Sequence, residues 1–237
     1  MAGGGLWVSS LYPDSVESAI EKFKGAKRVV LLPSTVCDCP ELLRVMDSRY
    51  TVFCRERKTY EYLCEAKTGA ELYLDYDMAL RLSKKALDLR FWSTSFYAEQ
   101  INLILNRISE IENIAFLLRN DGEKSFKHIP SDFDLSSVFS PVMTDNESRF
   151  VAALMLSVVD EFPAIVTDRL HVGIAAILMG KEVYLLDNSY GKVFSVYRHS
   201  FSHMANVYCC RSVEDIHLKK VKYQSNGNLQ HLLNALM

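Results

Sequence analysis

The sequence lacks a long hydrophobic run, an N-terminal targeting signal and a run of basic residues. A membrane-spanning helix needs about 20 consecutive apolar residues, and the apolar stretch at residues 151–159 is much too short. The first five residues, Met-Ala-Gly-Gly-Gly, have neither the basic start nor the apolar core of a signal peptide. These absences argue against a membrane span and predict a cytoplasmic protein.

The charge balance argues against a nucleic-acid partner. The 237 residues include 27 Lys and Arg against 29 Asp and Glu, which gives a formal net charge of -2. Proteins that bind nucleic acid usually present a basic face or a recognisable motif, and the sequence has neither. A content of 49% hydrophobic and 24% charged residues is that of an ordinary globular protein.

The sequence also lacks the patterns of a disulfide framework or a metal site. None of its six cysteines forms a C-x-x-C pair, and neither Cys37 with Cys39 nor the adjacent pair at 209–210 has a suitable spacing. We interpret the cysteines as reduced, mostly buried thiols. His199 and His203 are four residues apart but lack the glutamate of an H-E-x-x-H motif, so we expect no metal.

Apolar runs alternate with segments of helical spacing through the N-terminal part of the chain. The pattern predicts strands at 28–32, 51–53 and 72–74 and helices at 16–23, 41–47 and 58–67. Such alternation predicts an α/β fold with a Rossmann-like parallel sheet.

The middle of the chain predicts a helical link followed by a second sheet. We expect helices at 96–108 and 149–160, the second capped by Asp145 or Thr144, and a strand at 113–118. Residues 128–141 form a Ser/Asp/Pro-rich loop, and residues 229–236 have the spacing of a final amphipathic helix. The length admits one large domain or two small ones.

The stretch from Ile165 to Val193 is the most informative part of the sequence. It predicts a strand at 164–166, a buried helix at 170–179 that ends at Gly180, and a second strand at 183–186. We expect Thr167-Asp168 to end the first strand and to cap the helix. Strand-helix-strand units of this kind give a parallel sheet with a right-handed crossover.

Polar side chains follow both strands of this unit. In open parallel sheets ligands bind outside the carboxyl ends of the strands, so we expect these side chains to meet at one crevice. Arginine grips carboxylates and phosphates through two hydrogen bonds, lysine adds a point charge, and histidine moves a proton near neutral pH. The set therefore predicts an anionic ligand and proton transfer, although single members could be local caps or surface pairs. Its members are Asp168, Arg169, His171, Asn188, Ser189 and Lys192.

Several motifs resemble the polysaccharide pyruvyl transferase family. They are Thr-Asp-Arg-Leu-His at 167–171, Asp-Asn-Ser-Tyr-Gly-Lys at 187–192, Leu-Leu-Arg-Asn-Asp-Gly-Glu at 117–123, Arg-Glu at 55–56 and Tyr-Asp-Met-Ala at 76–79. The resemblance covers most of the chain and is stronger in its second half.

The resemblance implies two Rossmann-like domains that face a cleft, as in the glycosyltransferase B fold. We expect an N-terminal domain at 1–95 on the acceptor side and a C-terminal domain at 96–237 that carries the donor-binding signature. The chain starts almost on the glycines at 3–5, which follow an earlier strand-helix-strand portion in the family. We therefore expect the N-terminal domain to be incomplete, with an exposed or partner-covered sheet edge.

The resemblance also implies a reaction. The pyruvyl group of phosphoenolpyruvate is transferred to two hydroxyls of a sugar, with a cyclic ketal formed and phosphate released. No cofactor is required, because phosphoenolpyruvate is the donor substrate. Arg119, Arg169 and Lys192 would hold its carboxylate and phosphate, and His171 would be the general acid that protonates the methylene carbon.

Other residues of these motifs receive supporting roles by the same resemblance. Asn188 and Ser189 would hydrogen-bond phosphate oxygens, and Asp121 would orient Arg119 or bind a sugar hydroxyl. Arg55 would face the cleft from the first domain. Asp168 is interpreted as structural, either capping the helix or holding Arg169.

Two other functions stay open. One is a nucleotide-sugar glycosyltransferase on the same fold, although no ribose-binding acid stands out in the second domain. The other is a truncated paralogue that binds a glycan without turnover. The sequence does not determine the acceptor, which is a sugar or a lipid-linked oligosaccharide. It also leaves open the ketal linkage, a peripheral membrane association and the oligomeric state.

Overall fold

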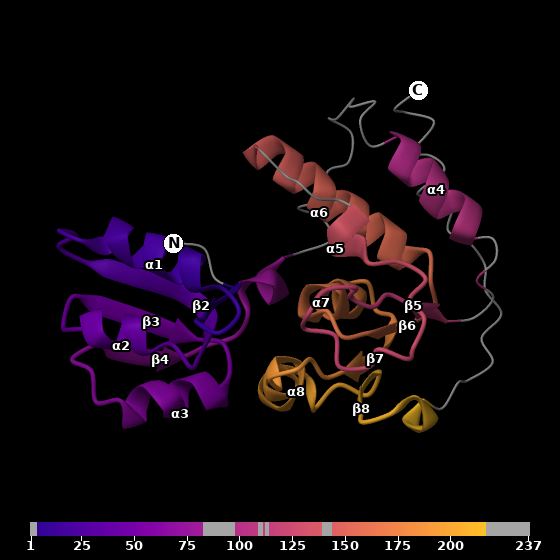
Figure 1. The fold of residues 1–237 in the computed structure, drawn as a ribbon. Helices are drawn as coiled ribbons and strands as arrows, with labels where there is room; N and C mark the ends of the chain where they lie inside the picture. The colour runs from indigo at the N-terminus through magenta and orange to yellow at the C-terminus, as the bar shows by residue number, and fades with distance from the viewer. Residues whose placement is uncertain (1–3, 83–97, 109–110, 112–113, 139–143, 217–237) are drawn as a thin grey trace. The chain divides into compact units, whose positions relative to one another are not determined.

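The computed structural model describes residues 4–82, 98–108, 111, 114–138 and 144–216 (Figure 1). The chain divides into two compact units, Met1–Arg81 with Ser195–Ser202, and Leu82–Phe194 with His203–Met237. The expected domain boundary between residues 95 and 96 lies outside the described residues, so the proposed domain limits stay a prediction. Residues 229–236, expected as a last helix, also lie outside them.

The first unit is built on one parallel sheet in the order β1-β2-β3-β4. The alternation of strands and helices expected from the sequence is confirmed. The strand expected to end at residue 32 instead continues to Cys37, and β1 was not among the expected strands. The elements are β1 (Gly4–Val8), α1 (Pro13–Phe23), β2 (Val29–Cys37), α2 (Pro40–Val45), β3 (Tyr50–Cys54), α3 (Arg57–Glu65), β4 (Glu71–Leu74) and η1 (Met78–Arg81).

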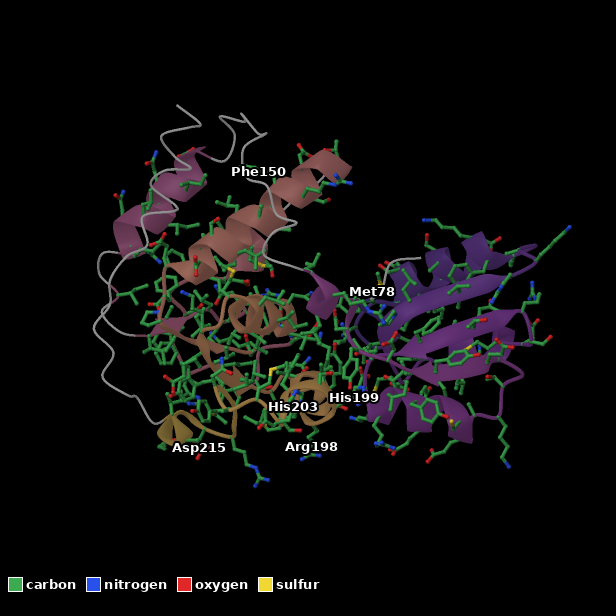
Figure 2. The ribbon with its side chains drawn as sticks, turned by 180° about the vertical axis from the view of Figure 1, so that it is seen from behind. Met78, Phe150, Arg198, His199, His203 and Asp215 are labelled. Carbon is green, nitrogen blue, oxygen red and sulfur yellow. The ribbon has the colours of Figure 1, made fainter. Side chains whose placement is uncertain are left out.

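The first unit also includes a segment from much later in the sequence. Tyr197–Phe201 forms a π-helix that contains His199 (Figure 2). The ring of His199 stacks on that of Tyr76, with 5.1 Å between the ring centroids. His199 Nε2 lies 3.1 Å from the carbonyl oxygen of Asp75, which can only accept, so this nitrogen carries the proton. The segment thus attaches to the loop that follows β4.

The second unit contains a parallel sheet in the order β5-β6-β7-β8. The mixed α/β class is therefore confirmed for both sheets, and the carboxyl ends of the four strands lie at one edge. The elements of this unit are α4 (Ala98–Ile108), β5 (Ala115–Phe116), α5 (Leu135–Val138), α6 (Asp145–Asp160), β6 (Ala164–Thr167), α7 (Leu170–Leu178), β7 (Glu182–Leu186), β8 (Val207–Cys210) and η6 (Val213–Asp215). Helix α8 (Lys192–Val196) begins in this unit and ends in the first one.

Helix α6 begins where one of the two expected caps lies. Thr144 is the N-cap and forms a capping box with Glu147, since Thr144 Oγ1 accepts from Glu147 N at 3.2 Å and the Glu147 carboxylate accepts from Thr144 N at 2.8 Å. These bonds satisfy backbone N–H groups that have no partner inside the helix.

Helix α7 confirms the buried helix expected after β6, but its cap differs from the expectation. The N-cap is Arg169, and no side chain caps the helix. Thr167 Oγ1 instead accepts from Arg169 N at 3.0 Å, and an Asp168 oxygen accepts from the backbone N of Arg119 at 2.9 Å. The prediction that Asp168 caps α7 is wrong, because its carboxylate ties the end of β6 to the segment after β5.

Neither a membrane span nor a metal cluster is found within the described ranges. No helix there is long and apolar enough to cross a membrane, and no three His, Cys, Asp or Glu side chains are grouped to hold a metal ion. The cysteines are free thiols, of which Cys39, Cys54 and Cys210 are buried and Cys64 is exposed. Burial raises the pKa of Cys54 to about 12, so this thiol stays protonated near neutral pH.

Candidate active site

Polar residues follow three neighbouring strands of the second unit, at one edge of its sheet. Arg119 follows β5, Asp168 and Arg169 follow β6, and Asn188 follows β7. Because β5, β6 and β7 are parallel and adjacent, their carboxyl ends lie side by side. The bond from Arg119 N to Asp168 Oδ1 fixes two of these ends directly. Arg169 and Asn188, which were expected to converge, therefore follow neighbouring strands, and Arg119, which was expected only from the family resemblance, follows the next strand of the same sheet.

Arg169 is held in a fixed orientation by acidic residues. Its Nε and Nη2 donate to the two carboxylate oxygens of Asp134 at 2.6 and 2.7 Å, a fork-to-fork pair. Nη2 also donates to Asp121 Oδ2 at 3.0 Å. Burial lowers the pKa of Arg169, but the hydrogen bond and charge of Asp134 outweigh it and raise that pKa above its usual value. Nη1 makes no hydrogen bond with the described residues.

Asp134 is a site residue that the sequence reading missed. Its carboxylate is buried and also accepts from Asn120 N at 2.9 Å and from Ser137 Oγ at 3.0 Å. Burial raises the pKa of Asp134, but the Arg169 hydrogen bond and the Asn120 N–H together hold it below the usual value. The carboxylate is thus a fixed anion that aims Arg169.

Arg119 is nearly buried and pairs with two further acids. Its Nη1 donates to Glu123 Oε2, and its Nε lies 2.9 Å from Asp121 Oδ1, within ion-pair distance but without a hydrogen bond. Nη2 has no hydrogen-bond partner in the part of the chain that the structure describes. Arg119, like Arg169, therefore has one side of its guanidinium group unengaged.

Glu123 connects Arg119 to the loop after β7. Its Oε2 accepts from Asn188 Nδ2 at 3.0 Å and lies 3.5 Å from Lys192 Nζ. Asn188 Oδ1 accepts from Lys192 N at 2.8 Å, so both ends of this buried amide bond to protein groups. Ser189 is exposed, and its backbone N donates to Glu123 O at 3.1 Å. The phosphate-binding roles expected for Asn188 and Ser189 stay predictions.

Lys192 and His171 complete the set of expected cationic and titratable groups. The Lys192 ammonium lies 5.1 Å from the centre of the Tyr190 ring. The π electrons of the ring attract the cation. His171 is exposed and is the second residue of α7. Its ring can therefore exchange protons with water, which a general acid requires between turnovers.

Asp168 lies deeper than the other acids of the site. Its Oδ1 accepts from Arg119 N, whereas its buried Oδ2 has no hydrogen-bond partner among the described residues. Burial raises the pKa of Asp168 above its usual value. The contact supports the structural role expected for Asp168, but through the segment after β5 and not through Arg169 or a helix cap.

Arg55, the site residue expected in the first unit, is fully buried there. Its Nε donates to Thr35 Oγ1 at 2.9 Å and its Nη1 to Asp77 Oδ2 at 2.8 Å, while Glu56 lies 3.6 Å away. Thr35 Oγ1 in turn donates to Glu56. These bonds tie the end of β3 to β2 and to the segment after β4. They describe a structural role, and the substrate-binding role of Arg55 stays a prediction.

Removing Arg55 should therefore destabilise the first unit. Arg55→Ala leaves the carboxylates of Glu56 and Asp77 buried without their cation, and breaking a buried ion pair in this way costs about 3–5 kcal/mol. We expect urea denaturation to show a loss of that size. As a control, Arg49→Ala breaks a half-exposed pair with Asp47, worth about 0–1 kcal/mol. Equal losses in the two variants would contradict the structural role of Arg55.

Comparison with known proteins identifies the class to which this fold and site belong. The sequence model of the polysaccharide pyruvyl transferase family matches residues 1–190, and the chain belongs to that family. The family expected from the sequence motifs is thereby confirmed. It gives the general kind of function, that of a transferase in polysaccharide biosynthesis.

A solved structure resembles the whole fold. It is the crystal structure of a protein of uncharacterized function from Klebsiella pneumoniae subsp. pneumoniae NTUH-K2044, with a TM-score of 0.65. The two sequences are 24% identical, over 89% of this chain and 74% of the other. At this identity the likeness concerns the fold alone. A search of the curated proteins finds no match.

Proposed function

We propose that this protein transfers the pyruvyl group of phosphoenolpyruvate to a sugar of an exopolysaccharide or cell-surface glycan, as a cyclic ketal. The observation that carries the proposal is that Arg119 and Arg169 follow adjacent strands of one sheet. One Nη atom of each guanidinium group makes no hydrogen bond with the described residues. Phosphoenolpyruvate presents a carboxylate and a phosphate, and two arginines with a nearby lysine, Lys192, suit both groups.

The reaction divides into two additions at the same carbon. Protonation of the methylene carbon leaves an oxocarbenium-like centre, which one sugar hydroxyl attacks while a base takes its proton. The carbon–oxygen bond to phosphate then breaks, and the phosphate leaves with the bonding electrons. The second hydroxyl attacks to close the ketal and gives its proton to the released phosphate. Phosphoenolpyruvate supplies the carbon and oxygen atoms of the transferred group, and the general acid supplies the third hydrogen of its methyl group. The proposed reaction includes neither a cofactor nor a metal.

In this mechanism His171 gives the first proton and Arg169 holds the carboxylate beside the reacting carbon. Arg119 and Lys192 take the phosphate, whose leaving becomes easier as its charge is neutralised. Asn188 and Ser189 assist the phosphate if the loop after β7 rearranges around the ligand. Asp121 lies between the two arginines and contacts both.

The remaining parts of the proposal concern the setting of the reaction. The two units are proposed to face a cleft as in the glycosyltransferase B fold, with the acceptor on the side of the first unit and Arg55 at its wall. A cytoplasmic location suits a donor made in central metabolism. The acceptor is a sugar or a lipid-linked oligosaccharide, which a peripheral membrane association would bring within reach.

An acceptor-dependent assay tests the proposal. The protein is incubated with phosphoenolpyruvate and a panel of bacterial glycan and lipid-linked oligosaccharide fractions, and phosphate release is followed together with acid-labile pyruvyl ketals by mass spectrometry. The proposal expects both products in stoichiometric amounts with at least one fraction and neither without acceptor. Sugar transfer from a nucleotide sugar, with phosphoenolpyruvate inert, would contradict it and favour a glycosyltransferase.

A further inference from the structure

Asp121 contacts both arginines of the site at once. Its Oδ2 accepts from Arg169 Nη2 at 3.0 Å, and its Oδ1 lies 2.9 Å from Arg119 Nε. A carboxylate that bridges two guanidinium groups is the arrangement in which an anionic ligand would bind them. Asp121 therefore lies where the charge of a ligand would be stabilised best.

Neither arginine needs Asp121 as its structural partner. Arg119 already pairs with Glu123, whose side chain is 5% exposed, and Arg169 already forms a two-bond pair with Asp134, whose side chain is 2% exposed. The side chain of Asp121 is 46% exposed. Ion pairs of an exposed carboxylate contribute little to stability, so the Asp121 contacts exchange readily for contacts with a more highly charged anion.

Among the ion-paired side chains of the site, a set that does not include Asp168, the charges balance only while Asp121 is counted. Arg119, Arg169 and Lys192 are cationic, and each lies within ion-pair distance of one or more of the carboxylates of Asp121, Glu123 and Asp134. With Asp121 in place an incoming anion meets no net positive charge from these six groups. With Asp121 turned away it meets a single positive excess beside two unengaged guanidinium nitrogens.

The local backbone leaves Asp121 room to turn away. The next residue, Gly122, is exposed, and a Cβ placed on it would meet no atom within 4 Å. The side chain is otherwise held by one short-range bond, in which Asp121 Oδ1 accepts from Glu123 N at 3.0 Å. Rotation about its side-chain bonds breaks this bond and the contacts with the two arginines, including the one with the buried Arg119 Nε, and an incoming anion can take the place of the carboxylate there.

We propose that the Asp121 carboxylate is an internal stand-in for the ligand's anionic group, which phosphoenolpyruvate must displace from the two arginines in order to bind. This inference rests on the proposed donor site and adds to it a competition between Asp121 and the ligand that sets donor affinity. We call this competition the gate. Anions with a single charge, such as simple carboxylates, do not displace Asp121 efficiently. A ligand that carries both a carboxylate and a phosphate does. Asp121 thus contributes to selectivity for a multiply charged donor.

The opposite roles for Asp121 predict opposite effects of the same substitution. If Asp121 positioned Arg119 or bound the sugar, D121N would weaken anion binding or leave it unchanged. As a stand-in, it competes with the anion, so D121N removes the competitor. The asparagine retains the size of the side chain and an oxygen that can accept from Glu123 N, so the turn is preserved.

Calorimetric titration with inorganic phosphate and with phosphoenolpyruvate tests the proposal on the full chain. We expect D121N to bind both about tenfold more tightly than the parent at low ionic strength, and the difference to shrink as salt screens the charge. D121S gives the same sign should D121N fold poorly. The matched control is D47N, because Asp47 is likewise half exposed, pairs with Arg49 and accepts the N–H two residues on; its affinities should equal those of the parent.

The outcomes separate the gate from the proposed function. Equal or weaker phosphate binding by both D121N and D121S overturns the gate, and a parent that still transfers the pyruvyl group would leave the function intact. Tighter phosphate binding by D121N together with no turnover of phosphoenolpyruvate by any variant supports the gate and contradicts the function.

Discussion

Arg169→Ala should lower the affinity for phosphoenolpyruvate by about a hundredfold or more. The guanidinium group is aimed by the two-bond pair with Asp134 and keeps Nη1 for the ligand. Each hydrogen bond between charged groups contributes about 1.5–3 kcal/mol, and the lost charge adds to this. Titration calorimetry on the parent and the variant measures the change directly.

Two further variants show that the loss reflects the ligand and not the fold. Arg169→Lys keeps the charge but loses the fork, so it should recover only part of the affinity. Arg149→Ala removes an exposed arginine of α6 and should bind like the parent. Unchanged affinity in Arg169→Ala would contradict the assignment of the donor site.

Arg169→Ala should also change how stability depends on pH. The pKa of Asp134 is below its usual value in the folded protein, so its pairing contributes stability above the unfolded pKa, near 4. In the parent this contribution is lost as the pH falls below that value towards the folded pKa. In Arg169→Ala the contribution is absent at neutral pH, and the variant's unfolding free energy should vary less between pH 6 and pH 3.

His171→Ala should lower kcat by about 10²–10⁴-fold while leaving the dissociation constant of phosphoenolpyruvate within a few-fold of the parent. The reason is that a general acid acts in the transition state and adds little to ground-state binding. Steady-state kinetics combined with calorimetry separates the two quantities.

His203→Ala is the matched control for this prediction. His203 is also exposed and belongs to the same unit. It precedes β8, whereas the residues of the proposed site follow the carboxyl ends of β5, β6 and β7. Its kcat should equal that of the parent. A His171→Ala variant that turns over at the parental rate would remove His171 from the mechanism and require another acid.

The parts of the fold that depend on local pattern were predictable. The run from Ala164 to Leu186 shows a strand, an all-apolar helix and a second strand in sequence, and the structure has β6, α7 and β7 at those places. Parallel neighbours bring Arg119, Arg169 and Asn188 to one edge, so their convergence also follows from topology.

The partners of the cations could not be predicted, because they come from remote parts of the chain. Asp134 lies 35 residues before Arg169 in a loop without periodicity, and nothing local distinguishes it from Asp132, which accepts from Phe116 N at 2.7 Å. Asp168 looks like a helix cap, yet its partner Arg119 is 49 residues away. Glu123 was visible as a motif residue, but its bonds to Asn188 and Lys192 depend on the tertiary fold.

Calorimetric titration of the unmodified protein with phosphoenolpyruvate, beside a nucleoside-diphosphate sugar, tests the central claim most directly. The account predicts saturable binding of one phosphoenolpyruvate per chain that is lost in Arg169→Ala, and no binding of the nucleotide sugar. Binding of the nucleotide sugar alone, or binding of phosphoenolpyruvate that is undiminished in Arg169→Ala, would contradict it.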